Sequence, residues 1–252
     1  MKTREMMGVY KLENMTWPEI RSEIDMGRDT VVVCFGSNEQ HGRHLPTGTD
    51  AIVADRIGLG LAERLGAFLA PTYRVGCSRH HMAFAGTITL EEETFKQVVI
   101  DTVRSLLHHG FKKIVLVPTH GGNFKPLGDA MEQLEVEEDA KVIAYTDLDG
   151  LMENAFEQAS AKGITEGQAG IHSGEWETSL MLEIAPELVK MNEAVAGNLD
   201  ELAEIKEKLH QGTHLVDENG VIGDPRLATA EKGRDYLEAT IDLICRKIKE
   251  SF

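Results

Sequence analysis

The sequence predicts an α/β fold with three layers (α/β/α), in which helices cover both faces of a mostly parallel central sheet. Short apolar segments rich in β-branched residues alternate along the chain with longer amphipathic segments, and this alternation is typical of strand–helix–strand units. Glycine or proline stands at many of the junctions. No linker or repeat interrupts the 252 residues, which suffice for one large core. We therefore expect a single domain over residues 1–252.

The expected elements follow one another in order. Strands are expected at residues 30–35, 68–71, 113–117 and 141–145. Helices are expected at residues 16–26, 50–65, 89–110, 126–134, 151–161, 180–184, 198–209 and 229–248. The helix starts at Thr16 and Thr89 have capping-box spacing, because a glutamate follows three residues after each threonine. Residues 212–226 are glycine-rich and polar, and they form either an ordered lid or a loop between subunits.

The composition argues against nucleic acid and membranes as partners. The chain has 42 acidic and 26 basic residues, a formal net charge of -16, and such a surface repels polyanions and anionic lipid. No apolar run approaches the ~18 residues of a membrane span. Residues 1–10 lack the apolar core of a signal peptide, and the three cysteines are too scattered for a disulfide framework. We therefore expect a cytoplasmic protein.

Acidic and imidazole side chains gather after the first expected strand. Glu39 and His41 are two residues apart, so their side chains leave an extended chain on the same face. Glycine and proline residues then bend the chain, which lets Asp50 return towards them. Two carboxylates and an imidazole suit a divalent ion such as zinc, manganese or iron. A solvated polar loop is the alternative, and the spacing alone does not decide between the two.

A second candidate group follows the strand at residues 113–117. His120 lies just past the carboxyl end of this strand. Gly121 and Gly122 would let the backbone approach a bound ligand, and Asn123 can hold the loop. Ligands of α/β sheets bind outside the carboxyl ends of the strands. Both candidate groups lie at that edge, so we expect them to share one site.

Three adjacent basic or imidazole side chains occupy the expected loop at residues 76–86. They are Arg79, His80 and His81. Loops carry many of the residues that bind ligands, so these side chains are candidates for substrate binding. A solvated turn explains them equally well.

His172, Glu175 and Glu177 precede the apolar helix expected at residues 180–184. Acidic residues are common at a helix N-terminus because the helix dipole favours them, and His172 would then be incidental. In the functional interpretation His172 moves a proton, since its unperturbed pKa lies near neutrality. Two residues apart, the glutamates diverge on a helix. We therefore expect Glu175 to be a fifth ligand and Glu177 to hold another group or to cap the helix.

Five motifs together resemble the creatininase (creatinine amidohydrolase) family. They appear in the order that the family has, at residues 36–42, 49–50, 84–87, 120–123 and 172–179. The resemblance implies a three-layer fold with a parallel sheet and hydrolysis of a non-peptide C–N bond. It also implies a divalent-metal centre, with two ions of zinc, manganese or iron per subunit, and assembly as a homohexamer.

The resemblance assigns four metal ligands residue by residue. They are Glu39, His41, Asp50 and His120, and Asp50 would bridge two ions. Creatininases proper carry a further glutamate ligand where this chain has Gly122. The acidic group would instead come from Glu175, as in family branches with the Gly-Gly version.

A second departure concerns the substrate. Creatininases proper cover the substrate with tryptophans on the loop before the His172 position, whereas residues 163–170 contain none. The pattern is therefore more similar to the branch that contains the formylaminopyrimidine deformylase, a formamide hydrolase, than to creatininase proper.

Together these features predict a metal-dependent amidohydrolase that cleaves an amide, formamide or cyclic amide of a small molecule with a metal-activated water. His172 would give a proton to the leaving nitrogen, and Glu175 or Glu177 would take one from the water if it does not ligate. Arg79, His80 and His81 would bind an anionic group of the substrate. Three alternatives stay open: creatinine–creatine interconversion proper, a metal-dependent sugar isomerase or aldolase, and a non-catalytic subunit stabilised by metal.

Overall fold

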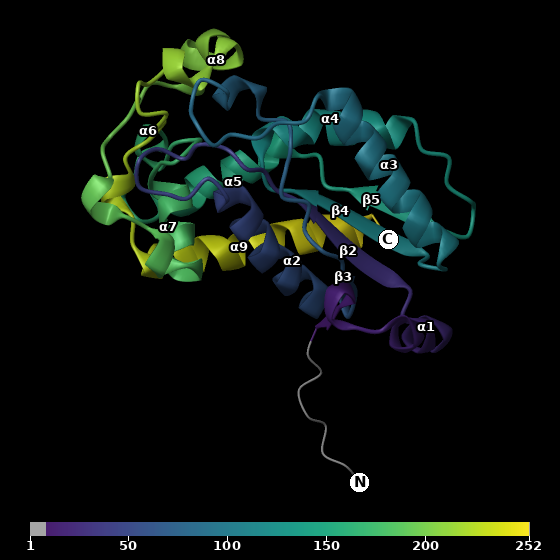
Figure 1. Ribbon diagram of the computed structural model, residues 1–252. Helices are drawn as coiled ribbons and strands as arrows, with labels where there is room; N and C mark the ends of the chain where they lie inside the picture. The colour runs from purple at the N-terminus through teal and green to yellow at the C-terminus, as the bar shows by residue number, and fades with distance from the viewer. Residues whose placement is uncertain (1–8, 252) are drawn as a thin grey trace.

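A five-stranded parallel sheet lies between two layers of helices (Figure 1). The computed structural model describes residues 9–251. The strands stand in the order β1-β3-β2-β4-β5, and each neighbouring pair is parallel. Their bounds are Tyr10–Lys11 for β1, Thr30–Phe35 for β2, Phe68–Leu69 for β3, Lys113–Pro118 for β4 and Lys141–Ala144 for β5. The expected three-layer α/β fold is confirmed. Strand β1 was not predicted, because its two residues, unlike those of β3, do not stand in an apolar run.

The central strand β2 is buried on both faces, so its side chains divide between two cores. Val31, Val33 and Phe35 face one core, and Val32 and Cys34 face the other. The first core is covered by α1 (Trp17–Asp25), α3 (Glu92–His108) and α4 (Gly121–Glu132). The second is covered by α2 (Thr49–Leu65), α5 (Leu148–Ser160), α7 (Glu175–Ile184) and α9 (Ala230–Glu250).

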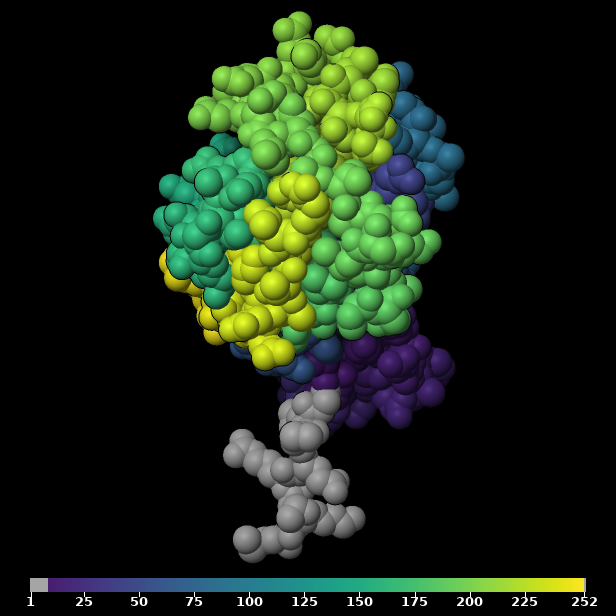
Figure 2. All heavy atoms as spheres, turned by 90° about the vertical axis from the view of Figure 1, so that its left-hand side faces the viewer, coloured from purple at the N-terminus to yellow at the C-terminus, as the bar shows by residue number. Residues whose placement is uncertain are grey.

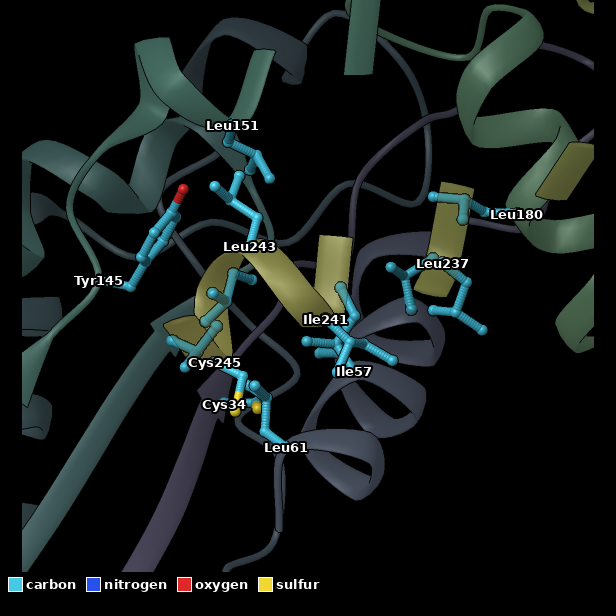
Figure 3. Packing of buried hydrophobic residues seen from close by; sticks show 14 of the residues in the cluster. Cys34, Ile57, Leu61, Tyr145, Leu151, Leu180, Leu237, Ile241, Leu243 and Cys245 are labelled. Carbon is cyan, nitrogen blue, oxygen red and sulfur yellow. The ribbon is translucent and has the colours of Figure 1, made fainter. Parts of the chain in front are cut away.

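The long C-terminal helix α9 is central to the second core. Figure 3 shows Cys34 of β2 beside Leu61 of α2 and Cys245 of α9, with Ile57 and Ile241 packed a little further along the same two helices. On the face shown in Figure 2, α9 (yellow) lies between α5 and the green segment that follows α7. The helix therefore joins α2, α5 and α7 into one layer.

Two shorter helices complete the chain. They are α6 (Glu166–Ala169) and α8 (Leu202–Gln211), and α8 lies at the top of the molecule in Figures 1 and 2. The segment that sequence analysis left open, residues 212–226, is an ordered loop with 3-10 turns at Thr213–Leu215 and Pro225–Leu227. Of the described residues, no helix combines the length and the apolar character that crossing a membrane requires. The expectation of no signal peptide concerns residues 1–10, most of which lie outside the described part.

One of the two expected capping boxes forms. At α1 the Glu19 carboxylate accepts hydrogen bonds from the backbone N–H and the hydroxyl of Thr16, each at 2.7 Å. The box expected at Thr89 is wrong, because α3 begins at Glu92. The Thr89 hydroxyl instead accepts a hydrogen bond from the Ser78 backbone N–H at 2.8 Å and ties two loops together.

Three helices begin earlier than expected, and one of them is α7, which begins at Glu175 and not at Leu180. Helix α4 begins at Gly121 and not near Pro126, which lies inside it. The predicted turn at the two glycines is therefore the first helical turn. Helix α5 begins at Leu148, because the Asp147 carboxylate caps it by accepting a hydrogen bond from the Gly150 N–H at 2.9 Å.

The packing of α7 on α9 leaves no room at Gly233. A Cβ there would lie 1.8 Å from the carbonyl oxygen of Ser179 in α7. We expect Gly233→Ala to lower the free energy of unfolding by about 1–3 kcal/mol, the usual effect of overpacking, although alanine otherwise favours a helix. In Gly128→Ala on α4, the matched control, the nearest atom would be a Thr146 methyl carbon at 3.8 Å. This substitution should raise the free energy of unfolding by about 0.5–1 kcal/mol. Urea unfolding followed by circular dichroism measures both, and a stabilising Gly233→Ala would contradict the close approach.

Candidate metal centre

The parallel pairing of β2 with β4 brings the first candidate residues together. The two strands pair from Thr30↔Lys113 to Phe35↔Pro118, so their carboxyl ends are level. The chain leaving β2 carries Glu39 and His41, and the chain leaving β4 carries His120. Asp50 stands in the first turn of α2, directly after that loop. Their four side chains, from segments far apart in the sequence, are at most 5% exposed.

The first group of candidate ligands consists of Glu39, Asp50 and His120. The Nδ1 atom of His120 lies 3.2 Å from Glu39 Oε2 and 3.3 Å from Asp50 Oδ2. Two carboxylates thus face one imidazole nitrogen, which is a donor set that suits a borderline divalent ion.

A second group lies beside the first and contains His41, His172 and Glu177. The Nε2 atom of His41 lies 3.4 Å from Asp50 Oδ1 and 3.8 Å from Glu177 Oε2. The rings of His41 and His172 are 4.4 Å apart between centroids. Asp50 therefore faces both groups, one with each carboxylate oxygen.

A third group combines Glu39 with His81 and His172. The Nε2 atom of His81 lies 3.2 Å from Glu39 Oε1, and Nδ1 of His172 lies 3.7 Å from the same oxygen. Glu39 therefore faces His120 through one oxygen and two further imidazoles through the other.

Backbone carbonyl groups orient two of the imidazoles. His120 Nε2 lies 3.0 Å from the Cys77 carbonyl oxygen, and His41 Nδ1 lies 3.1 Å from the Glu39 carbonyl oxygen. A carbonyl oxygen only accepts, so each of these nitrogens carries the hydrogen. The other nitrogen of each ring therefore faces the carboxylates, and it would be the ligating atom once a metal replaces its proton, as in metal sites where a second partner fixes the ligating tautomer.

Glycine backbone holds His172 in place. The His172 carbonyl accepts a hydrogen bond from the Ile222 N–H at 2.8 Å, and residues 170–174 pack directly on residues 222–223. A Cβ at Gly170 would lie 1.9 Å from the Ile222 carbonyl oxygen, and one at Gly174 would lie 2.3 Å from that of Ala169. In the same loop the Ser173 N–H donates to Glu177 Oε2 at 2.5 Å. The loop thus fixes His172 and Glu177 together.

The buried carboxylates favour positive charge at the centre. Burial alone would lower the pKa of His41, but Asp50 and Glu177 raise it well above its ordinary value. In the same way Glu39 and Asp50 raise the pKa of His120 against the effect of burial. Burial would raise the pKa of Asp50, yet the two imidazoles hold it below its usual range. The same pocket would stabilise a divalent cation.

Two further histidines of the site are held neutral. Burial, with the neighbouring His41, lowers the pKa of His172 to about 3. Burial and the nearby His172 lower the pKa of His81 far below its ordinary value.

Unpartnered buried atoms test whether the residues fit a metal. Among the described residues, Glu39 Oε1, His41 Nε2 and Asp50 Oδ2 are buried polar atoms without a hydrogen-bond partner. Buried polar atoms in folded proteins normally have partners, so three orphans within one cluster indicate a missing ligand. Carboxylate oxygens and an imidazole nitrogen fit a divalent ion.

The position of Glu175 differs from the expectation. Its carboxylate is fully buried but points at α9, where Oε1 lies 2.9 Å from Lys232 Nζ and Oε2 accepts a hydrogen bond from the Tyr236 hydroxyl at 3.2 Å. The Ser179 hydroxyl donates to Oε1 at 2.8 Å. The two glutamates diverge, as the helical spacing predicts, and it is Glu177 that faces the centre.

The three residues expected to bind the substrate lie in different environments. Arg79 is 83% exposed and pairs with Glu91 at 3.4 Å, outside the cluster. The His80 ring stacks on that of His120 at 5.8 Å, and burial lowers the pKa of His80 to about 4. His81 reaches Glu39, as described above.

The glycine pair and Asn123 shape the first turn of α4. Gly121 has open space beside it, whereas a Cβ at Gly122 would lie 2.1 Å from the Cys77 carbonyl oxygen. The buried Asn123 amide donates to the Phe35 and Gly36 carbonyl groups and accepts from the Cys77 N–H. Gly122 and Asn123 therefore hold this turn against the loops after β2 and at Cys77.

Sequence reasoning missed Gln40, whose amide contacts two of the site histidines, and Lys232, which neutralises Glu175. It also missed His44, which is buried and whose Nε2 lies 2.8 Å from the Thr178 hydroxyl. The motif at residues 36–42 already contained Gln40, but an uncharged amide gave no signal of chemistry.

A three-layer α/β fold with buried carboxylates and imidazoles at the carboxyl edge of its sheet defines an enzyme-like protein with a metal-capable centre. The chain belongs to the creatinine amidohydrolase (creatininase) family, since the family model matches residues 13–248. The mycofactocin precursor peptide peptidase of Mycobacterium ulcerans is 34% identical over 237 residues, which cover 90% of this chain and 83% of that protein.

Other relatives differ in the bond that their names describe. The 2-amino-5-formylamino-6-ribosylaminopyrimidin-4(3H)-one 5'-monophosphate deformylase of Methanothermus fervidus is 25% identical over 251 residues, covering 95% of this chain and 89% of that protein. Two solved creatininase structures, a manganese form and a Zn-Zn form, are each 25% identical with a TM-score of 0.79. Both alignments cover 97% of this chain, with 99% and 98% of the respective relatives.

The buried pair of Lys232 and Glu175 generates a stability prediction. Lys232→Met leaves the Glu175 charge buried without its partner, so we expect the free energy of unfolding to fall by about 3–5 kcal/mol. Lys247→Met, which removes a half-exposed lysine 3.7 Å from Asp147, should change it by at most about 1 kcal/mol. In the double variant Glu175→Leu/Lys232→Met we expect most of the loss to be recovered, because neither charge remains. Urea unfolding measures all three, and equal small losses for both lysines would contradict the pairing.

Proposed function

We propose that this chain is a metal-dependent amidohydrolase that cleaves a non-peptide C–N bond in an amide, formamide or cyclic amide. One observation carries the proposal. Carboxylates and imidazoles from the segments after β2 and β4 and from α2 and α7 converge at one edge of the sheet, where buried polar atoms have no hydrogen-bond partner. Membership of the creatinine amidohydrolase family supports the class of bond.

The proposed ligands form two sets that share one carboxylate. Glu39, Asp50 and His120 would hold one ion. His41 and Glu177 would hold a second together with Asp50, whose Oδ1 lies 3.4 Å from His41 Nε2. Glu177 takes the place that sequence analysis gave to Glu175. Zinc, manganese and iron all suit these oxygen and nitrogen donors. When bound, such ions lower the pKa of a water molecule and polarise a carbonyl group.

His172 is the proposed proton carrier. Its Nδ1 faces the cluster at 3.7 Å from Glu39 Oε1, and its Nε2 lies 2.8 Å from the Gln40 backbone carbonyl oxygen. A neutral imidazole at this place can take up a proton and deliver it to the leaving nitrogen. Glu177, held by the Ser173 N–H, would then act as a ligand and not as a base.

The substrate is a small molecule in this proposal, and His80 and His81 remain the proposed contacts for it, with the first turn of α4. Arg79 would contact only the outer part of a substrate, because its side chain is exposed. Assembly as a homohexamer, a cytoplasmic location and a single domain over residues 1–252 also remain predictions.

A second candidate substrate is a peptide. The relative with 34% identity is named a peptidase, which favours a peptide amide over creatinine–creatine interconversion. The sugar isomerase or aldolase alternative and the non-catalytic alternative find no support in the named relatives.

Removal of a ligand should remove metal. We expect Asp50→Ala to lose both ions, because Asp50 faces both groups, whereas His120→Ala should lose the ion of the first group. Inductively coupled plasma mass spectrometry of dialysed protein measures the metal content. His108→Ala, which removes an exposed histidine of α3, is the matched control and should keep the full content. Unchanged metal content in Asp50→Ala would sink the ligand assignment.

A substrate panel tests the reaction. Protein loaded in turn with zinc, manganese and iron(II) is offered formamides, cyclic amides, creatinine and short peptides, and the release of amine and carboxylate is measured. We expect turnover of at least one non-peptide amide, and a loss of at least about 100-fold in kcat for Glu39→Gln, because a ligand charge is removed. Turnover of peptides alone would overturn the non-peptide proposal and favour the second candidate.

A further inference from the structure

The buried side chain of Gln40 contacts three separate parts of the site. It is 5% exposed. Its Nε2 atom lies 2.9 Å from His81 Nδ1, 2.9 Å from His172 Nε2 and 3.1 Å from the Gly220 carbonyl oxygen. The ligand sets proposed above make no use of this amide, although it stands between the two neutral histidines that face Glu39.

One hydrogen bond fixes which end of the amide is which. The Gly42 backbone N–H donates to Gln40 Oε1 at 2.9 Å. A backbone N–H can only donate, so the atom that it meets is the oxygen, and the opposite atom is the NH2 group. Gln40 therefore offers two hydrogens to its remaining neighbours.

The acceptors around Gln40 determine where those hydrogens go. The Gly220 carbonyl oxygen takes one. His172 Nε2 lies 2.8 Å from the Gln40 backbone carbonyl oxygen, which only accepts, so this nitrogen carries a hydrogen of its own. The second amide hydrogen is then left for Nδ1 of His81. The Thr213 hydroxyl, 3.2 Å from the same nitrogen, can donate to it as well.

With these assignments the two histidines present different groups to Glu39: one a protonated nitrogen and the other a bare nitrogen. His81 accepts at Nδ1, so Nε2 carries the hydrogen of the ring, on the side that faces Glu39 Oε1, 3.2 Å away. His172 carries its hydrogen at Nε2, so its bare Nδ1 faces the cluster, 3.7 Å from that same oxygen.

We propose that Gln40 is a positioning residue that sets the tautomers of both histidines, so that His81 turns an N–H towards Glu39 while His172 turns a lone pair. His81 then presents an N–H, and not a lone pair, on the side of the site where Glu39 lies. The chemical use of the His172 lone pair rests on the proposed function, whereas the tautomers themselves do not.

The same amide ties down the loop after α8. Gly220 has a positive φ of 73°, and a Cβ there would lie 2.2 Å from Gln40 Oε1. A side chain at Gly220 therefore has to displace the Gln40 amide. Gly220→Ala is thus a second way to disturb the amide while Gln40 itself stays in the chain.

The test reads the tautomers directly. Magic-angle-spinning NMR of zinc-loaded protein with 15N-labelled histidine distinguishes a protonated from a bare ring nitrogen, and His81→Asn and His172→Asn identify the two rings. We expect a hydrogen at Nε2 in both rings of the wild-type protein. A hydrogen at Nδ1 of His81, or at Nδ1 of His172, would overturn the inference.

Variants then test the role of the amide. In Gln40→Glu both side-chain oxygens accept, so His81 should gain a hydrogen at Nδ1. Because partners of metal ligands typically contribute about 10–100-fold, the Kd for zinc or kcat on a panel substrate should worsen by this factor. Gly220→Ala should shift the same His81 signal. Gln97→Glu makes the same chemical change on the exposed side of α3 and should leave both rings unchanged. Unchanged rings in folded Gln40→Glu would contradict the proposal.

The outcomes separate this inference from the proposed function. The expected tautomers without turnover of any panel substrate would uphold the role of Gln40 and remove the proposed reaction. Turnover of a panel substrate with His81 protonated at Nδ1 would uphold the proposed reaction and remove the role of Gln40. If Gln40→Glu fails to fold, the wild-type spectrum and Gly220→Ala still decide the question.

Discussion

The site depends first on the parallel register between β2 and β4. Because Phe35 pairs with Pro118 at the ends of the two strands, the loop that carries Glu39 and the turn that carries His120 begin at the same level. A slip of one residue would turn every side chain of a strand to the opposite face and would separate the two. The Thr119 hydroxyl adds Asp50 to the arrangement by donating to its backbone carbonyl at 2.9 Å.

Burial of charge explains the division of labour on α7. A buried carboxylate is unfavourable unless a positive partner or hydrogen bonds stabilise it. Glu175 has such a partner inside the protein, Lys232. Glu177 has the Ser173 N–H and faces His41. The two acidic residues on this helix turn therefore have different roles. Glu175 links α7 to α9, whereas Glu177 is available to a cation.

The apolar strands and the edge at which ligands gather could be predicted because they depend on local pattern and topology. Four residues of the centre, Glu39, His41, Asp50 and His120, follow from that reasoning and lie within contact distance of one another. The orientation of the α7 glutamates could not be predicted, because it depends on Lys232 in a distant helix. The start of α4 was misplaced since a glycine pair predicts a turn equally well. Gln40 could not be predicted, because its role depends on which neighbouring atoms its amide donates to and accepts from. Only the contacts in the folded structure show this.

The backbone packing behind His172 has a consequence for how relatives diverge. Residues 170–174 and 222–223 touch through main-chain atoms, where even one extra carbon at Gly170 would meet a carbonyl oxygen. That wall of the centre tolerates almost no change of side chain. In the turn at Arg79–His81 and in α8, which contacts it, Arg79 and most residues of α8 are exposed and can change without such a clash. We therefore expect a new substrate preference on this scaffold to arise at such exposed positions and not in the backbone wall behind His172.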